Sequence, residues 1–219
     1  MKKISCFLLI LLPWLANGSA WAQTYTIGIV PQQLASQLAK LWVPILEELG
    51  KALGFKLQFS TAKDIPTFEQ RLFGGYYDFA YMNPYHHVVF SQKLGYHAFT
   101  WEKDKLIQEI LVVQKDSPIK DIEDLKQQQL AFLSPAAFAA SVLPRVSLTK
   151  QSIPFTPKYV KSHDSVYRSV AKEIFSAGRG IKRTFNSMPE EICSELRVFW
   201  TTDGFTPHAF AVHPRILGV

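Results

Sequence analysis

Residues 25–60 read YTIGIVPQQLASQLAKLWVPILEELGKALGFKLQFS, and this stretch decides the fold. Its first six residues alternate and are rich in Ile, Val and Thr, which is typical of a β-strand. Apolar residues then recur at helical spacing over residues 34–53, with Pro44 inside the run and Gly54 after it. Residues 55–59 are a second predicted strand. A strand, a helix and a strand in this order indicate a parallel sheet covered by helices.

The same alternation continues along the rest of the chain. We expect further strands over residues 78–82, 97–101, 107–114, 130–133, 155–160, 197–200 and 209–212. We expect further helices over residues 68–73, 85–92, 122–128, 135–148 and 164–175. The Ala-Gly-Arg-Gly run at residues 177–180 indicates a flexible connector. The pattern therefore contains two α/β units in succession.

Two such units predict an α/β protein of two lobes. We expect residues 23–110 and 198–219 to form a discontinuous first lobe, and residues 111–197 to form the second lobe. The strands near residues 107–114 and 197–201 are the candidate connections between them. Two lobes joined by strands make a hinge, and the cleft between the lobes is the natural place for a ligand.

The chain begins with a basic and then apolar segment. MKK at residues 1–3 precedes an apolar run over residues 4–12, and AWA at residues 20–22 ends the segment with small residues. This combination is typical of a cleavable secretory signal peptide. The apolar run is too short to span a bilayer, which takes about 20 residues. We therefore expect residues 1–22 to be a signal peptide and the rest of the chain to be exported to the periplasm.

The charge of the chain does not indicate a nucleic-acid partner. The 219 residues include 24 Lys and Arg against 18 Asp and Glu, a formal charge of +6. Residues 1–22 hold two of the lysines and no acid, which leaves 22 basic residues against 18 acidic ones. The remaining basic residues are scattered among acids and aromatics, whereas a nucleic-acid surface shows a dense basic stripe. We expect a monomer that binds a small anion and no nucleic acid.

The sequence lacks the common signatures of enzymes and metal sites. Nucleophile elbows, Walker loops, dinucleotide fingerprints and HExxH motifs are absent. His86 and His87 are adjacent and would point about 100° apart on a helix. His208 and His213 are five residues apart around a strand, which is poor spacing for a shared metal. We therefore expect no catalytic residue, no metal and no cofactor, and an exported hydrolase is the weaker alternative.

Candidate ligand-binding residues gather at three strand-to-helix corners. Open α/β sheets bind their ligands at the carboxyl ends of the strands, and each corner follows such an end. The first and third corners contribute Tyr81, Asn83, Tyr85, His163, Asp164 and Ser165. A histidine donates a hydrogen bond to an anion, so we expect His163 to contact the ligand. Asp164 and Ser165 are equally explained as caps of the helix that begins there.

The second corner is a run of small residues at a predicted helix start. It begins at Ser134 and includes Ala137, Phe138, Ala139 and Ala140. The free backbone N–H groups of a helix start bind anions, and small side chains let a ligand come close to them. Tight helix packing explains the same small residues without a ligand, so both interpretations stay open. The three corners together favour a ligand site in the cleft.

Several blocks of residues in this order resemble one known family. The blocks are Asp64–Glu69, Tyr77–Pro84, Asp116–Ile119, Ser134–Phe138 and Lys182–Phe185. Over nearly all of residues 25–215 the chain is similar to the phosphate, phosphite and phosphonate substrate-binding proteins of ABC transporters. The resemblance implies a type II periplasmic-binding-protein fold with a hinge and an inter-lobe cleft. It also implies capture of a small oxyanion by closure of the lobes, and delivery of that anion to a membrane permease.

The resemblance also implies roles for positions in the cleft. The family's aromatic strand end matches Tyr81 and its neighbours, its oxyanion-binding helix start matches residues 137–140, and its cleft histidine matches His163. The chain has Ala-Phe-Ala at residues 137–139, where characterised phosphonate binders have Ser and Thr hydroxyls. No acid around residues 177–180 matches the one that accepts a P–OH proton in the family. A sensor that acts on a membrane histidine kinase would need the same cleft and is the alternative to transport.

Overall fold

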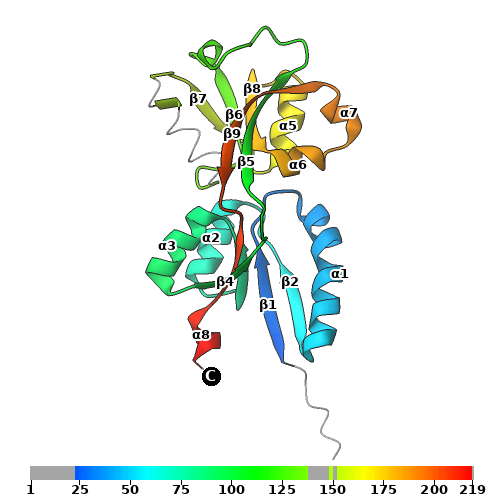
Figure 1. Cartoon of the computed structure of the whole chain (residues 1–219), viewed down its shortest axis with the longest axis vertical. Helices are drawn as coiled ribbons and strands as arrows, with labels where there is room; N and C mark the ends of the chain where they lie inside the picture. The colour runs from blue at the N-terminus through cyan, green and yellow to red at the C-terminus, as the bar shows by residue number, and fades with distance from the viewer. Residues whose placement is uncertain (1–22, 138–147, 150–151, 219) are drawn as a thin grey trace, which may run out of the picture.

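The computed structural model describes residues 23–137, 148–149 and 152–218, and it contains two five-stranded sheets, one in each lobe (Figure 1). The first sheet has the strand order β2-β1-β3-β10-β4, and the second has the order β7-β6-β8-β5-β9. In both sheets the first three strands are parallel, and the fourth runs antiparallel to its two neighbours. The lobes share one topology, and the predicted two-lobed α/β fold is confirmed.

The first sheet uses the two ends of the described chain. Its strands are β1 (Thr24–Ile29), β2 (Lys56–Ser60), β3 (Phe79–Met82), β4 (His97–Trp101) and β10 (Ala209–Val212). The helices of this lobe are α1 (Ala35–Leu53), α2 (Ile65–Phe73), α3 (Pro84–Leu94) and α8 (Pro214–Leu217). β1, α1 and β2 follow one another as the opening stretch of sequence predicts.

The second sheet uses the middle of the chain. Its strands are β5 (Ile107–Gln114), β6 (Gln129–Phe132), β7 (Thr156–Tyr159), β8 (Ala177–Ile181) and β9 (Leu196–Phe205). The helices of this lobe are the 3-10 helix η1 (Ile122–Leu125), α5 (His163–Ala171), α6 (Lys182–Asn186) and α7 (Glu190–Cys193). Within the described parts of the chain, no helix has the length and hydropathy needed to cross a bilayer.

Short polar side chains and glycine explain where the first-lobe helices begin and end. Asp64 accepts a hydrogen bond from the Thr67 N–H at the start of α2, and Asn83 accepts one from the His86 N–H at the start of α3. These bonds satisfy N–H groups that have no partner inside the helix. Gly54 ends α1 with a left-handed φ of 76°, which glycine adopts without steric cost.

Each lobe buries its own core, and the second sheet buries both of its faces. In β5, Leu111 and Val113 join one buried cluster, whereas Ile110 and Val112 join another cluster together with side chains of α5. The split follows from the period of two along a strand. Because each fully buried aliphatic side chain contributes about 1.5–3 kcal/mol, two such layers hold the second lobe together.

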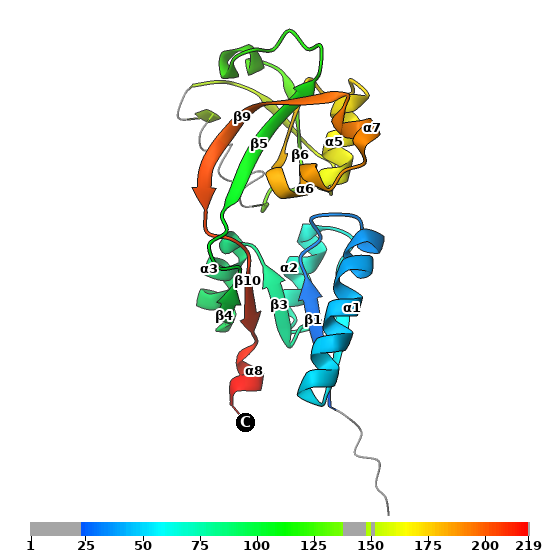
Figure 2. The ribbon, with the colours of Figure 1, turned by 45° about the vertical axis from the view of Figure 1, so that its right-hand side comes forward.

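The chain crosses between the lobes twice. One crossing joins β4 to β5 and the other joins β9 to β10, and Figure 2 shows both on the same side of the molecule. A Cβ at Gly204 would lie 2.4 Å from the Leu106 side chain, so the two crossings pack closely. Paired crossings of this kind are typical of a hinge. β5 and β9 pair along their whole lengths, from Ile107 opposite Phe205 onward. The chain therefore passes from one sheet to the other over residues 101–107 and again over residues 205–209. The division into lobes at residues 110 and 198 stays a prediction.

The predicted connector at residues 177–180 is wrong. These residues form most of β8, a buried strand at the centre of the second sheet. Its glycines are required by packing: a Cβ at Gly178 would lie 2.6 Å from Val166, and one at Gly180 would lie 2.1 Å from the Tyr167 hydroxyl. In this strand, glycine marks the close approach of α5 rather than flexibility.

The end of α5 also differs from the prediction. The helix stops at Ala171, and Lys172 is its C-cap, whereas the predicted helix continues to residue 175. Glu173 has a left-handed φ of 57°, which interrupts the helix. The Ile174 side chain, beyond this end, is 63% exposed.

The second corner has a different backbone from the predicted one. Pro135 and Ala136 form a turn instead of the first turn of a helix, and the Ala137 N–H donates to the Ser134 carbonyl at 3.1 Å. Phe138, Ala139 and Ala140 lie outside the described residues.

Candidate functional site

The carboxyl ends of the parallel strands of both sheets meet between the lobes. In each sheet the segments that follow these ends contain polar residues. They include Gln32 after β1, Asn83 after β3, Ser134 after β6, His163 after β7 and Arg183 after β8. This is the position where open α/β sheets bind ligands. Figure 2 shows α6, which carries Arg183, on the side of the second lobe that faces the first lobe.

A pocket of about 300 Å³ lies at this junction. Its polar lining comes from both lobes and consists of Gln32, Gln33, Gln37, Tyr81, Arg183, Thr184 and Ser187. Its apolar lining consists of Ile29, Val30, Leu38, Leu41 and Trp42 of the first lobe. An apolar cavity with a few convergent polar groups is the usual form of a small-molecule site.

Arg183 supplies the positive charge of this pocket. Its Nη2 donates to the Tyr81 hydroxyl oxygen at 3.3 Å, and its Nη1 lies 3.4 Å from Glu102 Oε2. Both contacts are long, and the Arg183 side chain is half-exposed. A guanidinium has five N–H donors in a fixed plane, so most of them remain available to an oxyanion. Arg183 is not among the predicted ligand-binding residues, because the sequence predicts a connector before it and not a strand end.

Tyr81 is the predicted site residue that the structure places directly in the pocket. Its ring packs on Trp42 at 5.1 Å and stacks on His208 at 5.2 Å between ring centroids. The hydroxyl oxygen accepts from Arg183, so its hydrogen is free to donate to a ligand. These contacts fix the ring in one orientation at the end of β3.

His208 lies beside Tyr81 and is buried. The amide Nε2 of Gln32 donates to His208 Nε2 at 2.8 Å, which puts the ring proton of a neutral imidazole on Nδ1. Burial, and then the nearby Arg183 guanidinium, hold the pKa of His208 well below its usual range. His208 Nδ1 has no hydrogen-bond partner among the described residues. His208 is not among the residues that the sequence predicts to bind the ligand.

His163 lies in the first turn of α5 and is almost fully buried. Its backbone N–H donates to the Gln32 carbonyl at 3.0 Å, across the junction of the lobes. Burial, with a smaller contribution from Arg183, lowers the pKa of His163 to about 3, so the ring is neutral. The ring stacks on Tyr167 at 6.0 Å, and Nδ1 has no partner among the described residues. His163 is not among the residues that line the pocket, and its contact with a ligand stays a prediction.

Asp164 joins the lobes instead of capping its own helix. Its Oδ2 accepts from the Leu34 N–H at 3.2 Å, at the start of α1 in the first lobe. Ser162 is the N-cap of α5 and accepts from the Ser165 N–H at 3.1 Å. The Ser165 hydroxyl accepts from the Ser162 hydroxyl at 2.9 Å. The predicted residues Asp164 and Ser165 therefore have structural partners within the protein.

The remaining predicted residues differ in their surroundings. Asn83 caps α3 with Oδ1 and donates from Nδ2 to the Ala136 carbonyl of the other lobe at 3.4 Å. Ser134 is buried, and its hydroxyl has no partner among the described residues. Ala137 is buried in the first-lobe core cluster. Tyr85 is exposed on α3 and contacts the His86 ring, away from the residues that line the pocket.

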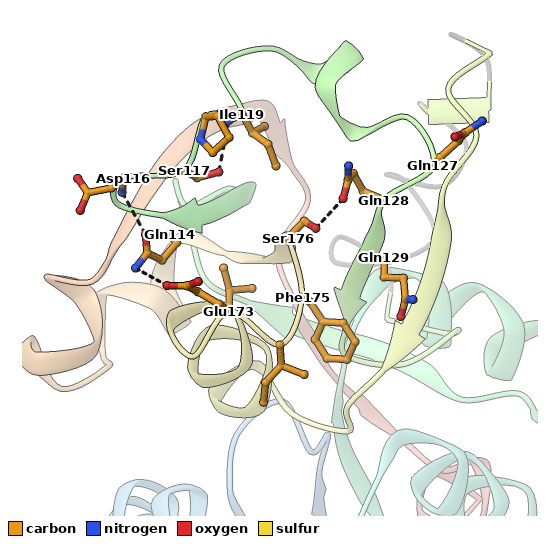
Figure 3. Close-up of a pocket in the computed structure, with 13 residues that line it drawn as sticks. Gln114, Asp116, Ser117, Ile119, Gln127, Gln128, Gln129, Glu173, Phe175 and Ser176 are labelled. Carbon is orange, nitrogen blue, oxygen red and sulfur yellow. Dashed lines mark hydrogen bonds between the residues drawn. The ribbon is translucent and has the colours of Figure 1, made fainter.

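A larger hollow of about 730 Å³ lies elsewhere on the second lobe (Figure 3). It is lined by the end of β5 and by residues just before β6 and β8, at the amino ends of these parallel strands. Asp116 and Glu173 are its charged residues, and Gln114 donates to Glu173 Oε1 at 3.3 Å. Two carboxylates repel an anion, and the strand ends here are opposite to those that bind ligands. The smaller pocket is therefore the better candidate for an anion site.

The described residues contain no group of three or more His, Cys, Asp or Glu side chains placed to hold a metal ion. His86 Nε2 lies 3.3 Å from Glu69 Oε1 in the first lobe. A histidine and one carboxylate fall short of the three or four ligands of a typical protein zinc site.

Comparison with known proteins gives consistent matches. A family model described as "ABC transporter, phosphonate, periplasmic substrate-binding protein" matches residues 27–217. The phosphate-import protein PhnD of Mycolicibacterium smegmatis is 19% identical over 236 residues, which cover 93% of this chain and 70% of that protein.

Two solved structures share the fold. PhnD1 of Prochlorococcus marinus, in complex with methylphosphonate, superposes with a TM-score of 0.80 at 18% identity and covers 89% of this chain and 78% of its own. A binding protein component of an ABC phosphonate transporter from Pseudomonas aeruginosa has a TM-score of 0.76 at 15% identity and covers 87% of this chain and 68% of its own.

Proposed function

The chain belongs to the family of phosphonate periplasmic substrate-binding proteins of ABC transporters, and we propose that it captures a phosphonate or phosphate in the pocket between its lobes. Members of this family bind substrates for transport and are not enzymes, so no exported hydrolase is proposed. The ligand class is supported by the relatives, one of which is a phosphate importer and another of which was solved with methylphosphonate.

The half-exposed guanidinium of Arg183 is the observation that carries the proposal. It lines a pocket in which no described residue is an acid, and the Tyr81 hydroxyl lies within 3.3 Å of it. Arg-to-oxyanion hydrogen bonds are charge-assisted and often bidentate. The neutral rings of His163 and His208 add buried nitrogen atoms nearby without adding charge.

Contacts between the lobes support capture by closure. Hydrogen bonds cross the junction from Asn83 to Ala136, from His163 to Gln32 and from Leu34 to Asp164. An anion that bridges Arg183 of one lobe and Tyr81 of the other would stabilise the closed arrangement over an open one. The closed protein would then be recognised by the ABC transporter permease, and we propose that it acts as a monomer.

Calorimetric titration of the purified protein with phosphate, phosphite and methylphosphonate tests the proposal. Binding of at least one of the three is expected. A well-folded sample that gives no binding heat with any of them would contradict the oxyanion proposal.

The predicted role of His163 is tested in the same titration. A hydrogen bond to a charged group contributes about 1.5–3 kcal/mol, so the His163→Ala variant should bind about tenfold more weakly or worse. An unchanged affinity would leave His163 with a packing role only.

We also propose export through residues 1–22, which are a predicted signal peptide outside the described residues. Mass spectrometry of the protein from the periplasmic fraction should give the mass of a chain that begins at Gln23. A protein found there at its full-length mass would contradict cleavage.

A further inference from the structure

We infer that the pocket also takes short alkylsulfonates, and this inference rests on the proposed function. Alkylphosphonates and alkylsulfonates present similar tetrahedral groups with three oxygens. They differ in one proton, because the phosphonate monoanion keeps a P–OH donor and the sulfonate has none. A protein binds the phosphonate selectively over the sulfonate when it offers a hydrogen-bond acceptor for that proton. A charged acceptor gives the strongest selectivity.

The described lining of the pocket offers no carboxylate for this purpose. Two acids of the surrounding elements have partners away from the pocket, since Asp164 accepts from the Leu34 N–H and Glu109 pairs with Arg179. Glu102 lies outside the described lining, with Oε2 3.4 Å from Arg183 Nη1. The sequence has no Asp or Glu between Asp124 and Asp164, so the segment that follows β6 adds none. A carboxylate would also repel a sulfonate, and this repulsion is missing from the described lining.

Arg183 is the charged group of the described lining, and the other polar groups of this lining are neutral. Arg183 is a donor only, and the Tyr81 hydroxyl hydrogen is free. The Thr184 hydroxyl already donates to the Ile181 carbonyl, and the Ser187 hydroxyl donates to the Arg183 carbonyl. The acceptors that remain are the neutral oxygens of these hydroxyls and of the glutamine amides, whose bonds to a P–OH group are weaker than those of a carboxylate. Such a lining binds the negative charge of the ligand and discriminates little between a ligand with a P–OH group and one without.

The apolar wall indicates which sulfonates would fit. Leu38, Leu41 and Trp42 of α1 face the same cavity as Arg183. With about 300 Å³ available, the anionic group can lie at Arg183 while a short alkyl group contacts this wall. The ligand class is therefore a small molecule with an apolar carbon attached to a tetrahedral anionic head.

Parallel titrations with methylphosphonate and methanesulfonate at pH 7 test the inference. The two dissociation constants are expected to lie within about tenfold of each other. Methylphosphonate binding with methanesulfonate more than tenfold weaker overturns the inference and leaves the proposed function standing. Binding of neither ligand overturns both.

A carboxylate placed in the pocket should create the missing selectivity. Gln37 lines the pocket on α1, so Gln37→Glu would add a charged acceptor there, and Gln37→Met is the matched uncharged control. In Gln37→Glu, methanesulfonate should lose at least tenfold more affinity than methylphosphonate does at pH 6, where the phosphonate keeps its proton. Equal losses for both ligands would contradict the inference. In Gln37→Met, the ratio of the two affinities should stay as in the unmodified protein.

Discussion

Arg179 and Arg183 are four residues apart in the sequence and have opposite surroundings. Arg179 lies in β8 and is fully buried, with Nη1 2.5 Å from Glu109 Oε1 and its guanidinium 5.0 Å from the Trp200 ring centroid. Arg183 lies in α6, is half-exposed and makes two long contacts, to Tyr81 and Glu102. The charge of Arg179 is therefore used inside the second lobe, whereas that of Arg183 faces the pocket.

The difference shows that residue type alone does not locate an anion site. A buried arginine with a paired carboxylate is locally neutralised, and removing either partner leaves an uncompensated charge. A half-exposed arginine whose existing contacts are long can replace those contacts by hydrogen bonds to a ligand, at a small cost in free energy. An arginine that is buried and strongly paired has a structural role, whereas an arginine that is half-exposed and weakly paired is available to bind a ligand.

Removal of the Arg179 charge should give the largest change in free energy, and this change is in the stability of the fold. Arg179→Met leaves Glu109 buried without its partner and should lower the free energy of unfolding by about 3–5 kcal/mol. Burial, opposed by Arg179, raises the pKa of Glu109 to about 7. A raised folded pKa destabilises the fold as pH rises through it, so the deficit should be larger at pH 8 than at pH 5. Chemical denaturation at both pH values measures this.

The double variant Arg179→Met with Glu109→Gln is the control for that comparison. Replacing both charges removes the uncompensated carboxylate, so most of the lost stability should return. The remaining deficit should no longer differ between pH 5 and pH 8, because the glutamine introduced by Glu109→Gln does not titrate. A double variant as unstable as the single one would mean that Arg179 acts through packing on Trp200 and not through its charge.

Removal of the Arg183 charge should affect binding and leave the fold unchanged. Arg183→Ala should weaken the binding of methylphosphonate by tenfold or more, since charge-assisted bonds contribute about 1.5–3 kcal/mol. Its free energy of unfolding should stay within about 0.5 kcal/mol of the unmodified protein, as is usual for exposed positions. Arg183→Lys keeps the charge and should retain part of the affinity. A loss of stability as large as that of Arg179→Met would remove the distinction between the two arginines.

The smallest expected change in ligand affinity comes from removing the hydrogen bond between the Leu34 N–H and Asp164, which joins the two lobes. Asp164→Ala removes the carboxylate that accepts from the Leu34 N–H, and α1 has no side-chain cap of its own. Loss of a helix-start bond costs about 1 kcal/mol, so ligand affinity should fall about fivefold through a less stable closed form. Asp164→Asn keeps an acceptor oxygen and should restore most of the affinity. Equal affinities in all three proteins would show that this bond does not contribute to closure.

The alternation of strands and helices predicted most of the fold from the sequence. The predicted strands 97–101, 107–114 and 209–212 match β4, β5 and β10 residue for residue. β8 was missed because its glycines and arginine carry no apolar pattern, and their reason lies in the close packing of α5. Missing that strand also hid Arg183, which follows its carboxyl end.

Other parts of the site depend on contacts between distant segments. Gln32 and His208 are 176 residues apart and meet only because β1 and β10 flank β3 in one sheet. Asp164 has the sequence signature of a helix cap, but Ser162 takes that role and Asp164 contacts the other lobe. The period of apolar residues reports which face of an element is buried, and it carries no information on such pairs.

A crystal structure of the protein with methylphosphonate tests the central claim most directly. The expected result is an anionic head within hydrogen-bond distance of the Arg183 guanidinium and the Tyr81 hydroxyl, with the pair of Arg179 and Glu109 unchanged. A methylphosphonate bound in the hollow of Figure 3, or one bound between the lobes without contact to Arg183, would contradict the account.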